Sequence, residues 1–380
     1  MLLTRSPSAL VACNIYVSAG RSQYSDILIS ILERCMERCQ LLRLGQTELS
    51  SKKYFNQYTS GATSRNKQIA VIHAYSDQVY DRSSFHLAGN ADLVADVASS
   101  LAIDAISSLK GIVYENEINA KSSDKTRHPL IGIVDHISVM PLVTENNDKN
   151  TKVMELSQNE IIENHESYTP PDSHGICSAY IGNRLKENGI NVFYYGSAHP
   201  NQTPLAIVRR EKTQFFNSGG LDDDDDNGIK NQCTVGSPSN FVENFNILLS
   251  NNINKKKAMG LTRKIRARDG GLVGVEALTL PYSDGRYEVA CNLLCPEEGS
   301  VSDILQVVDT WVLEEQQLLG KDKLDEGTSK EYFVDCCYRV GTTAQQCLDI
   351  MENCSEGKLG FFVDYDIALS DRFRQYLAKV

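Results

Sequence analysis

The sequence predicts an α+β protein built from two similar halves, and three observations support this. Helical and strand-like apolar patterns follow one another in the order β-α-β-β-α-β within residues 1–216, and this order returns within residues 234–380. A polar, acidic stretch at 217–233 separates the two runs. A chain of 380 residues is also long enough for two hydrophobic cores. We therefore expect an N-terminal subdomain, an acidic linker loop and a C-terminal subdomain with a polar tail over these ranges.

The first half contains well-marked helices and strands. Apolar side chains recur at helical spacing between Tyr24 and Leu44, whereas the first apolar run is typical of a strand. We expect strands at 9–17, 68–75, 82–88 and 190–195 and one opened by His128, with helices at 24–44, 90–109 and 173–188. The split unit consists of the strands at 9–17, 68–75 and 82–88, the strand opened by His128, and the helices at 24–44 and 90–109. In this unit two helices cover one face of an antiparallel sheet.

The second half repeats this order without obvious sequence repetition. We expect strands at 241–249, 273–282, 287–294 and 332–339, with helices at 255–268, 302–319 and 344–351. Ser283-Asp284-Gly285, between two alternating runs, predicts a hairpin. Trp311 lies in an apolar helical stripe, so we assign it to the core rather than to a ligand platform. Together the halves predict two ferredoxin-like subdomains that face each other across a ligand groove.

Composition limits the kinds of partner that the protein can have. The net charge is -11, of which the run Asp222–Asp226 supplies five units. Because nucleic acids are bound by clustered cations, we do not expect one as a partner. The eleven cysteines are scattered, which favours a reducing compartment, and they do not follow zinc-site spacings, so we expect no metal. No apolar run reaches the roughly 18 residues of a membrane span, and we expect a cytoplasmic protein.

The strongest candidate for chemistry is His128. It precedes Pro129, which disfavours the helical region for His128, so this histidine is expected to end a loop and open an apolar strand. Asp135 follows seven residues later in the same run. Histidine is the side chain that titrates near neutral pH without assistance. The alternative is a half-exposed histidine that has only a structural role.

Several short motifs, taken in order, resemble one family. They are Asp81-Arg82-Ser83-Ser84-Phe85 with Gly89, His128-Pro129 with Gly132, Asp135 and Pro141, Tyr195-Gly196, Phe245-Asn246 and Asn292-Leu293. This series resembles the formiminotransferase domain family of glutamate formimidoyltransferase and formimidoyltransferase-cyclodeaminase. The resemblance covers nearly the whole chain. It is strongest for the stand-alone plant-type relatives that lack the cyclodeaminase part.

The resemblance implies transfer of a formimino group from N-formimidoylglutamate to tetrahydrofolate, the co-substrate, in the groove between the subdomains. It also implies formimidoylglutamate-like small molecules as partners and a tendency to form homodimers. The histidine of the family's His-Pro motif is the general base, a role that falls here to His128, with Asp135 supporting the strand or orienting the base. Arg82 would pair with a substrate carboxylate or would be a surface arginine. The implied substrate- or folate-binding residues are Arg82, Asp81, Tyr195, Gly196, Asn246 and Asn292.

The sequence departs from the family at several of these places. His73 and Tyr75 stand where the family has aspartates, Asp81 replaces an asparagine, and Leu130 replaces an arginine. The acidic run Asp222–Asp226 and the residues after it replace a folate-contacting loop, and the run would repel a glutamate tail. A second hypothesis therefore stays open: a catalytically weakened member that binds folate and acts as a regulator or scaffold.

Overall fold

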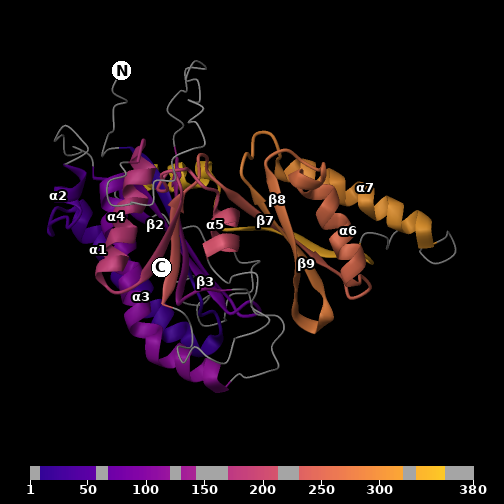
Figure 1. The fold of residues 1–380 in the computed structure, drawn as a ribbon, viewed down its shortest axis with the longest axis horizontal. Helices are drawn as coiled ribbons and strands as arrows, with labels where there is room; N and C mark the ends of the chain where they lie inside the picture. Colours follow the sequence, from indigo (N-terminus) through magenta and orange to yellow (C-terminus); the bar gives the residue numbers. More distant parts are fainter. Residues whose placement is uncertain are drawn as a thin grey trace, which may run out of the picture.

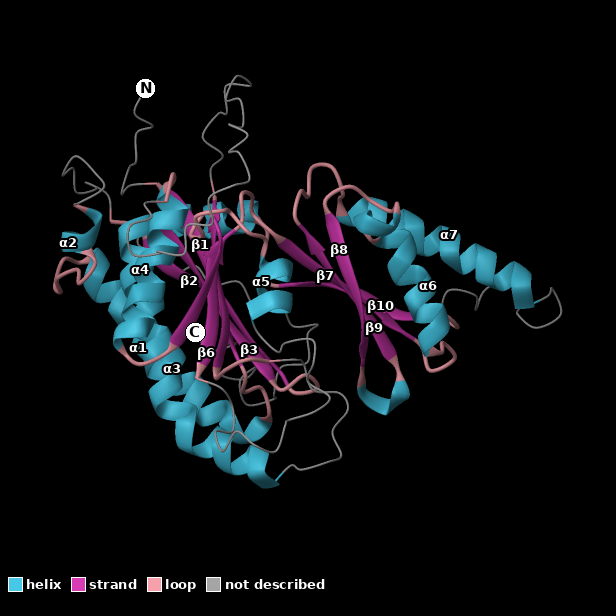
Figure 2. Cartoon of the chain, in the orientation of Figure 1, coloured by secondary structure: helices cyan, strands magenta, loops and turns pink. Residues whose placement is uncertain are grey.

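The computed structural model describes residues 9–56, 67–119, 130–142, 170–212, 231–319 and 331–355. Within these residues the strands form one six-stranded and one four-stranded sheet. The longer helices lie on the outer sides of the two sheets, and the sheets lie toward the middle of the molecule (Figure 1, Figure 2). The prediction of an α+β protein is therefore confirmed.

The first sheet has the strand order β2-β3-β1-β4-β6-β5. Its strands are β1 (Leu10–Val17), β2 (Ile69–Asp77), β3 (Arg82–Asn90), β4 (Val134–Pro141), β5 (Asn191–Gly196) and β6 (Gln232–Ser237). The first four in this order pair antiparallel, whereas β4, β6 and β5 pair parallel. β4 begins at Val134, later than the sequence suggested, and His128 lies outside the described residues.

Side-chain alternation gives this sheet two different faces. Val11, Cys13 and Ile15 of β1 belong to the main core, which lies under the helices. The residues between them point the other way because successive side chains of a strand alternate. One face is thus an apolar support for helices, and the other, the inner face, carries polar groups such as Asn14 and Tyr16.

Three long helices cover the outer face of the first sheet (Figure 1). The helices of this half are α1 (Ser25–Arg43), α2 (Lys52–Phe55), α3 (Ala91–Asn119), α4 (Ser173–Glu187) and α5 (Leu205–Lys212), with a short 3-10 turn, η1 (Ser22–Tyr24). α1, α3 and α4 supply most of the helical residues of the core. α5 and β6 were not predicted as elements. β6 contains the last residues of the predicted linker and the first of the predicted second subdomain, yet it pairs with β4 and β5.

The second sheet has the order β10-β7-β9-β8, and its described pairs are antiparallel. Its elements are β7 (Glu243–Leu249), α6 (Lys255–Ile265), η3 (Ala267–Asp269), β8 (Val275–Pro281), η4 (Ser283–Gly285), β9 (Tyr287–Leu293), α7 (Val301–Leu319), β10 (Val334–Val340) and α8 (Ala344–Ser355). Trp311 is 2% exposed in the core beneath α6 and α7, so its assignment to the core is confirmed. β8 and β9 are paired across the predicted turn, where Asp284 has a φ of 57°.

The last helix returns to the first sheet. α8 packs on the inner face, where Cys347, Ile350 and Met351 form a small apolar cluster with residues of β1, β2, β3 and β4. Tyr338 and Val340 of β10 pack against the main core. One end of the inner face is therefore covered by α8. None of the described helices combines the length and the apolar character that crossing a membrane requires.

Candidate functional site

The inner face of the first sheet carries a cluster of charged and aromatic side chains. These come from neighbouring strands and from α5, which packs on β5 and β6. The cluster, which we call the inner-face cluster, consists of Tyr16, Arg82, Asp135, His136, Tyr195, Arg209 and Thr234. Adjacent strands bring these residues together although they are far apart in the sequence.

Asp135 is the centre of this cluster and is 1% exposed. The register between β1 and β4 shifts at Asp135, which is therefore the extra residue of a β-bulge. Its Oδ2 accepts hydrogen bonds from Arg82 Nη2 at 3.2 Å and Arg209 Nη2 at 3.0 Å. Its Oδ1 accepts one from the Ile131 amide at 3.0 Å, which ties the carboxylate to the chain entering β4.

The two arginines give the cluster an excess of positive charge. Arg209 is 5% exposed and also donates to the Thr234 hydroxyl at 2.9 Å and to the Asp135 carbonyl at 3.2 Å. The Arg82 side chain is 14% exposed, and its guanidinium lies 4.5 Å from the centre of the Tyr16 ring. Arg82 is therefore not a surface arginine. Two guanidinium groups around one carboxylate leave a formal excess of one positive charge among these three side chains, which suits an anionic ligand.

Aromatic rings form the other part of the cluster. The His136 ring stacks on Tyr16, with centroids 5.5 Å apart and an interplanar angle of 8°. His136 Nε2 lies 2.9 Å from the Tyr195 hydroxyl. Burial raises the pKa of Tyr16 and of Tyr195, so both phenols keep their protons at neutral pH. The cluster therefore combines aromatic rings and neutral hydroxyl groups with its cations.

Gly196 has a structural reason to be glycine. Its φ is 56°, and an added Cβ would lie 1.9 Å from the carbonyl oxygen of Ser237 in β6. Gly189, with a φ of 78°, has nothing within 4 Å of an added Cβ. The two glycines therefore separate the effect of backbone conformation from the effect of a steric clash.

We expect Gly196→Ala to destabilise the protein more than Gly189→Ala. Gly189→Ala should lower the free energy of unfolding by roughly 1 kcal/mol through its positive φ alone. Gly196→Ala should cost a further 1–3 kcal/mol, roughly, because β5 and β6 must separate. Urea unfolding of both variants measures the difference, and equal losses would contradict the proposed clash.

Asp81, another predicted binding residue, is hydrogen-bonded to backbone amides. It is 5% exposed, has a φ of 51°, and its Oδ1 accepts hydrogen bonds from the amides of Gly20 at 2.8 Å and Arg21 at 3.2 Å. These contacts hold the loop after β1 against the turn between β2 and β3. Asp81 therefore has a structural role in this loop. Its contact with substrate stays a prediction.

The two predicted asparagines lie on the second sheet, one buried more deeply than the other. Asn246 donates from Nδ2 to Glu288 Oε1 at 2.8 Å. Asn292 is exposed, and its Oδ1 accepts from Asn244 Nδ2 at 2.6 Å. The Tyr16 hydroxyl donates to Asn244 Oδ1 at 3.4 Å, so the inner-face cluster meets the second sheet at this point.

Glu288 is a fully buried carboxylate on the second sheet. Burial raises its pKa from its ordinary 4.5 to about 7. Hydrogen bonds from Tyr338, Tyr80 and Asn246 lower the pKa and so oppose this rise, whereas the negative charge of Asp77 adds to it. Burial likewise raises the pKa of Asp77 from 3.8 to about 6. A carboxyl group whose pKa is higher in the folded protein favours folding when it is protonated.

We therefore expect stability to fall as the pH rises from about 4.5 to about 7. Glu288 contributes fully to the free energy of unfolding below its unfolded pKa, and this contribution is lost as the pH rises through its folded pKa. The contribution is at most about 3 kcal/mol. Urea unfolding of the wild type and of Glu288→Gln across this interval measures it. The variant should show a shallower dependence, and parallel curves would contradict the assignment.

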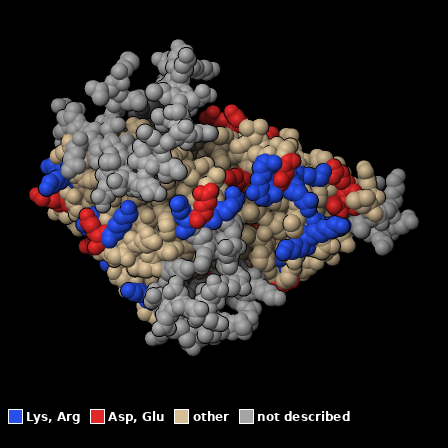
Figure 3. Space-filling model, in the orientation of Figure 1, with Lys and Arg blue, Asp and Glu red and all other residues tan. Residues whose placement is uncertain are grey.

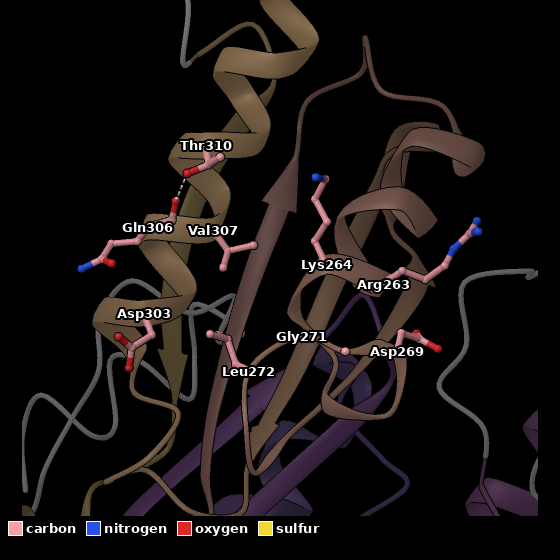
Figure 4. A pocket seen from close by; sticks show the side chains of 10 residues that line it. Arg263, Lys264, Asp269, Gly271, Leu272, Asp303, Gln306, Val307 and Thr310 are labelled. Carbon is pink, nitrogen blue, oxygen red and sulfur yellow. Dashed lines mark hydrogen bonds between the residues drawn. The ribbon is translucent and has the colours of Figure 1, made fainter.

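A hollow of about 650 Å³ lies elsewhere, between the end of α6 and the first half of α7 (Figure 4). Its lining includes Arg263, Lys264, Asp303, Gln306 and Thr310, and none of the predicted site residues. Lys and Arg side chains gather over α6 with acidic side chains among them (Figure 3), and Lys264 pairs with Glu314 at 2.9 Å. We place the candidate site at the inner-face cluster because buried charges and aromatic rings converge there. In the described part of the chain, no three His, Cys, Asp or Glu residues are grouped as metal ligands would be.

Only some of the predicted site residues come together. Arg82, Asp135 and Tyr195 belong to the inner-face cluster, and Gly196 follows Tyr195 at the end of β5. The sequence assigned no role to the other members of the cluster, which are Tyr16, His136, Arg209 and Thr234. Strand alternation in β1 could have indicated Tyr16, but no local signal could have indicated Arg209.

The fold and the site define an α+β protein with two sheets and a buried, charged and aromatic cluster on the inner face of one of them. The family model of the formiminotransferase domain, N-terminal subdomain, matches residues 10–232, a range that includes every residue of the cluster except Thr234. The chain belongs to the formiminotransferase domain family, which confirms the resemblance in the sequence. Of the predicted site residues, only Asn246 and Asn292 lie outside the matched range.

One similar protein is the "Formiminotransferase cyclodeaminase-like protein" of Arabidopsis thaliana. It is 25% identical over 309 residues, which are 75% of this chain and 88% of the relative. Among solved structures, the periplasmic protease PqqL from Escherichia coli gives a TM-score of 0.18 at 10% identity, and pitrilysin gives 0.16 at 12%. This chain spans about 42% of the length of each of the two. These TM-scores are too low to support an argument about fold or function.

Proposed function

We propose that this protein binds folate and transfers a formimino group from N-formimidoylglutamate to tetrahydrofolate. Membership of the family supports formimino transfer in general. The observation that supports a site for it is the convergence of Arg82 and Arg209 on Asp135, beside stacked aromatic rings and within the matched range. The antiparallel order β2-β3-β1-β4 supports the ferredoxin-like topology that we propose for the first subdomain.

The chemistry of the inner-face cluster fits a folate. The pterin and aminobenzoyl rings are flat and apolar on their faces, and we expect them to pack beside the aromatic rings of the cluster, which include the stacked pair Tyr16 and His136. Both substrates also carry glutamate carboxylates, which the excess positive charge of Arg82 and Arg209 would attract. Binding both molecules in one groove removes most of the entropic cost of bringing them together.

His128 is proposed as the general base. Attack of the tetrahydrofolate N5 on the formimino carbon forms a new carbon–nitrogen bond, and N5 must lose a proton. The bond from this carbon to the glutamate nitrogen then breaks, and that nitrogen gains a proton. A group that titrates near neutral pH can serve both steps. Asp135 would support the base indirectly, because its bond to the Ile131 amide anchors the chain three residues after His128.

The second hypothesis is a catalytically weakened member that binds folate as a regulator or scaffold. The feature that favours it is the packing of β2 at the positions where the family has aspartates. His73 is fully buried, and its ring meets that of His86 edge-on at 5.2 Å. Tyr75 is 5% exposed, and burial raises its pKa, so it stays neutral. These side chains do not supply the negative charge of the aspartates that they replace.

A combined binding and turnover assay separates the two hypotheses. The purified protein should be stabilised against thermal unfolding by tetrahydrofolate and should convert it to the formimino adduct when formimidoylglutamate is added. Stabilisation without turnover would support the regulator or scaffold. If no folate stabilised the protein, both folate proposals would be rejected. Cytoplasmic localisation and the homodimer stay predictions.

A further inference from the structure

The turn between β2 and β3, residues 78–81, reaches from the first sheet to the second. Tyr80 at its tip is 7% exposed and packs with Leu248 and Tyr282 of the second half. The Tyr80 and Tyr282 rings meet edge-on with centroids 5.6 Å apart. Tyr80 is therefore buried at a contact between the two halves, although the turn connects two strands of the first sheet.

Glu288 lies at the centre of this contact. This β9 residue has no exposed surface, and its Oε1 accepts from the Tyr80 hydroxyl at 2.9 Å and from Asn246 Nδ2 at 2.8 Å. Its Oε2 accepts from the Tyr338 hydroxyl of β10. One carboxylate thus joins the turn of the first sheet to β7, β9 and β10 of the second, through donors that hold it in one orientation.

The turn is braced internally, so a shift of Tyr80 would be passed along the chain. Asp77 Oδ1 accepts from the amides of Val79 at 2.8 Å and Tyr80 at 3.0 Å. Asp81 adopts a positive φ and is held by the amides of the loop after β1. Arg82 comes next in the chain and reaches Asp135 in the inner-face cluster.

We propose that Glu288 is a positioning residue that, through the hydroxyl of Tyr80, holds the 78–81 turn against the second sheet and so sets the place of Arg82 beside Asp135. Glu288 does not touch the proposed substrates itself. Its bond to Tyr80 joins residues 208 positions apart, and it makes the position of an arginine on one sheet depend on the other sheet. The link to ligand binding rests on the proposed function. The proposal that Glu288 holds the 78–81 turn against the second sheet does not depend on it.

The first test uses the protein without ligand. Tyr80→Phe keeps the ring and removes the donor to Glu288, and Glu288→Gln removes the charge. Tyr282→Phe is the matched control, because it removes a tyrosine hydroxyl in the same contact without removing a hydrogen bond to Glu288. Amide hydrogen exchange at residues 77–82 should become roughly tenfold faster in Tyr80→Phe, the change expected for the loss of one buried hydrogen bond. Unchanged exchange in both Tyr80→Phe and Glu288→Gln would overturn the proposal.

The second test measures tetrahydrofolate binding and formimino transfer in the same variants. We expect KM for tetrahydrofolate to rise about fivefold to tenfold in Tyr80→Phe, with kcat within twofold of the wild type, because ground-state positioning is disturbed and the base is not. Tyr282→Phe should resemble the wild type. If amide exchange at residues 77–82 were faster in Tyr80→Phe but no folate stabilised the protein, Glu288 would still be shown to hold the turn, and the proposed function would be rejected. Wild-type exchange and wild-type KM in Tyr80→Phe would reject the positioning role alone.

Discussion

Replacing Asp135 with alanine is expected to lower the free energy of unfolding by about 3–5 kcal/mol, because Arg82 and Arg209 would remain buried without their shared carboxylate. The substitution also removes the acceptor of the Ile131 amide. Two largely buried cations repel each other and have lost most of their hydration. The inner-face cluster should therefore rearrange or take up water.

Urea unfolding measures this loss, and a second aspartate provides the control. Asp269 also pairs with an arginine, Arg266, but at an exposed 3-10 turn, so Asp269→Ala should cost no more than about 1 kcal/mol. Asp135→Asn, which keeps the shape and loses the charge, should fall between the two alanine variants. A loss below about 1 kcal/mol for Asp135→Ala would show that the two arginines do not depend on this carboxylate.

Replacing His128 with alanine is expected to reduce formimino transfer by at least about 100-fold, the usual effect of losing a general acid–base group. Because the predicted role is chemical, thermal stability and the stabilisation by tetrahydrofolate should stay close to those of the wild type. Turnover should be measured at saturating concentrations of both substrates, so that kcat is compared rather than binding.

Two other histidines make this test specific. His174 pairs with Asp172 at the start of α4 and does not belong to the inner-face cluster, so His174→Ala should leave turnover unchanged. His136 does belong to the cluster and lies eight positions after His128. If His136→Gln stopped turnover and His128→Ala did not, the role of general base would pass from His128 to His136.

Most elements could be predicted because their signals are local. The alternation of β1 and the helical stripe around Trp311 each lie within one short segment, and burial follows from the pattern. α5 was missed because it is only eight residues long, and β6 because it begins inside a polar stretch. Both are stabilised by the neighbours that they meet in the folded chain, which a local pattern does not contain.

The candidate site shows the same division. Arg82, Asp135 and Tyr195 were predicted from motifs, whereas Arg209 reaches Asp135 from 74 positions away. The role proposed for Glu288 depends on a partner 208 positions away. Neither pairing has a signature in the sequence, because the side chains meet only through strand order and sheet packing.

The sequence by itself determined the family, the α+β class and the segments that become strands and helices, since these depend on short motifs and on the period of apolar residues. Only the tertiary structure decided which charges are neutralised and which part of the inner face is covered. β6 carries Thr234 to Arg209, α8 covers one end of the first sheet, and Tyr80 reaches Glu288 on the second sheet. The physical reason is that a buried charge is stable only where distant segments supply its partners, and the packing of the sheets sets those positions.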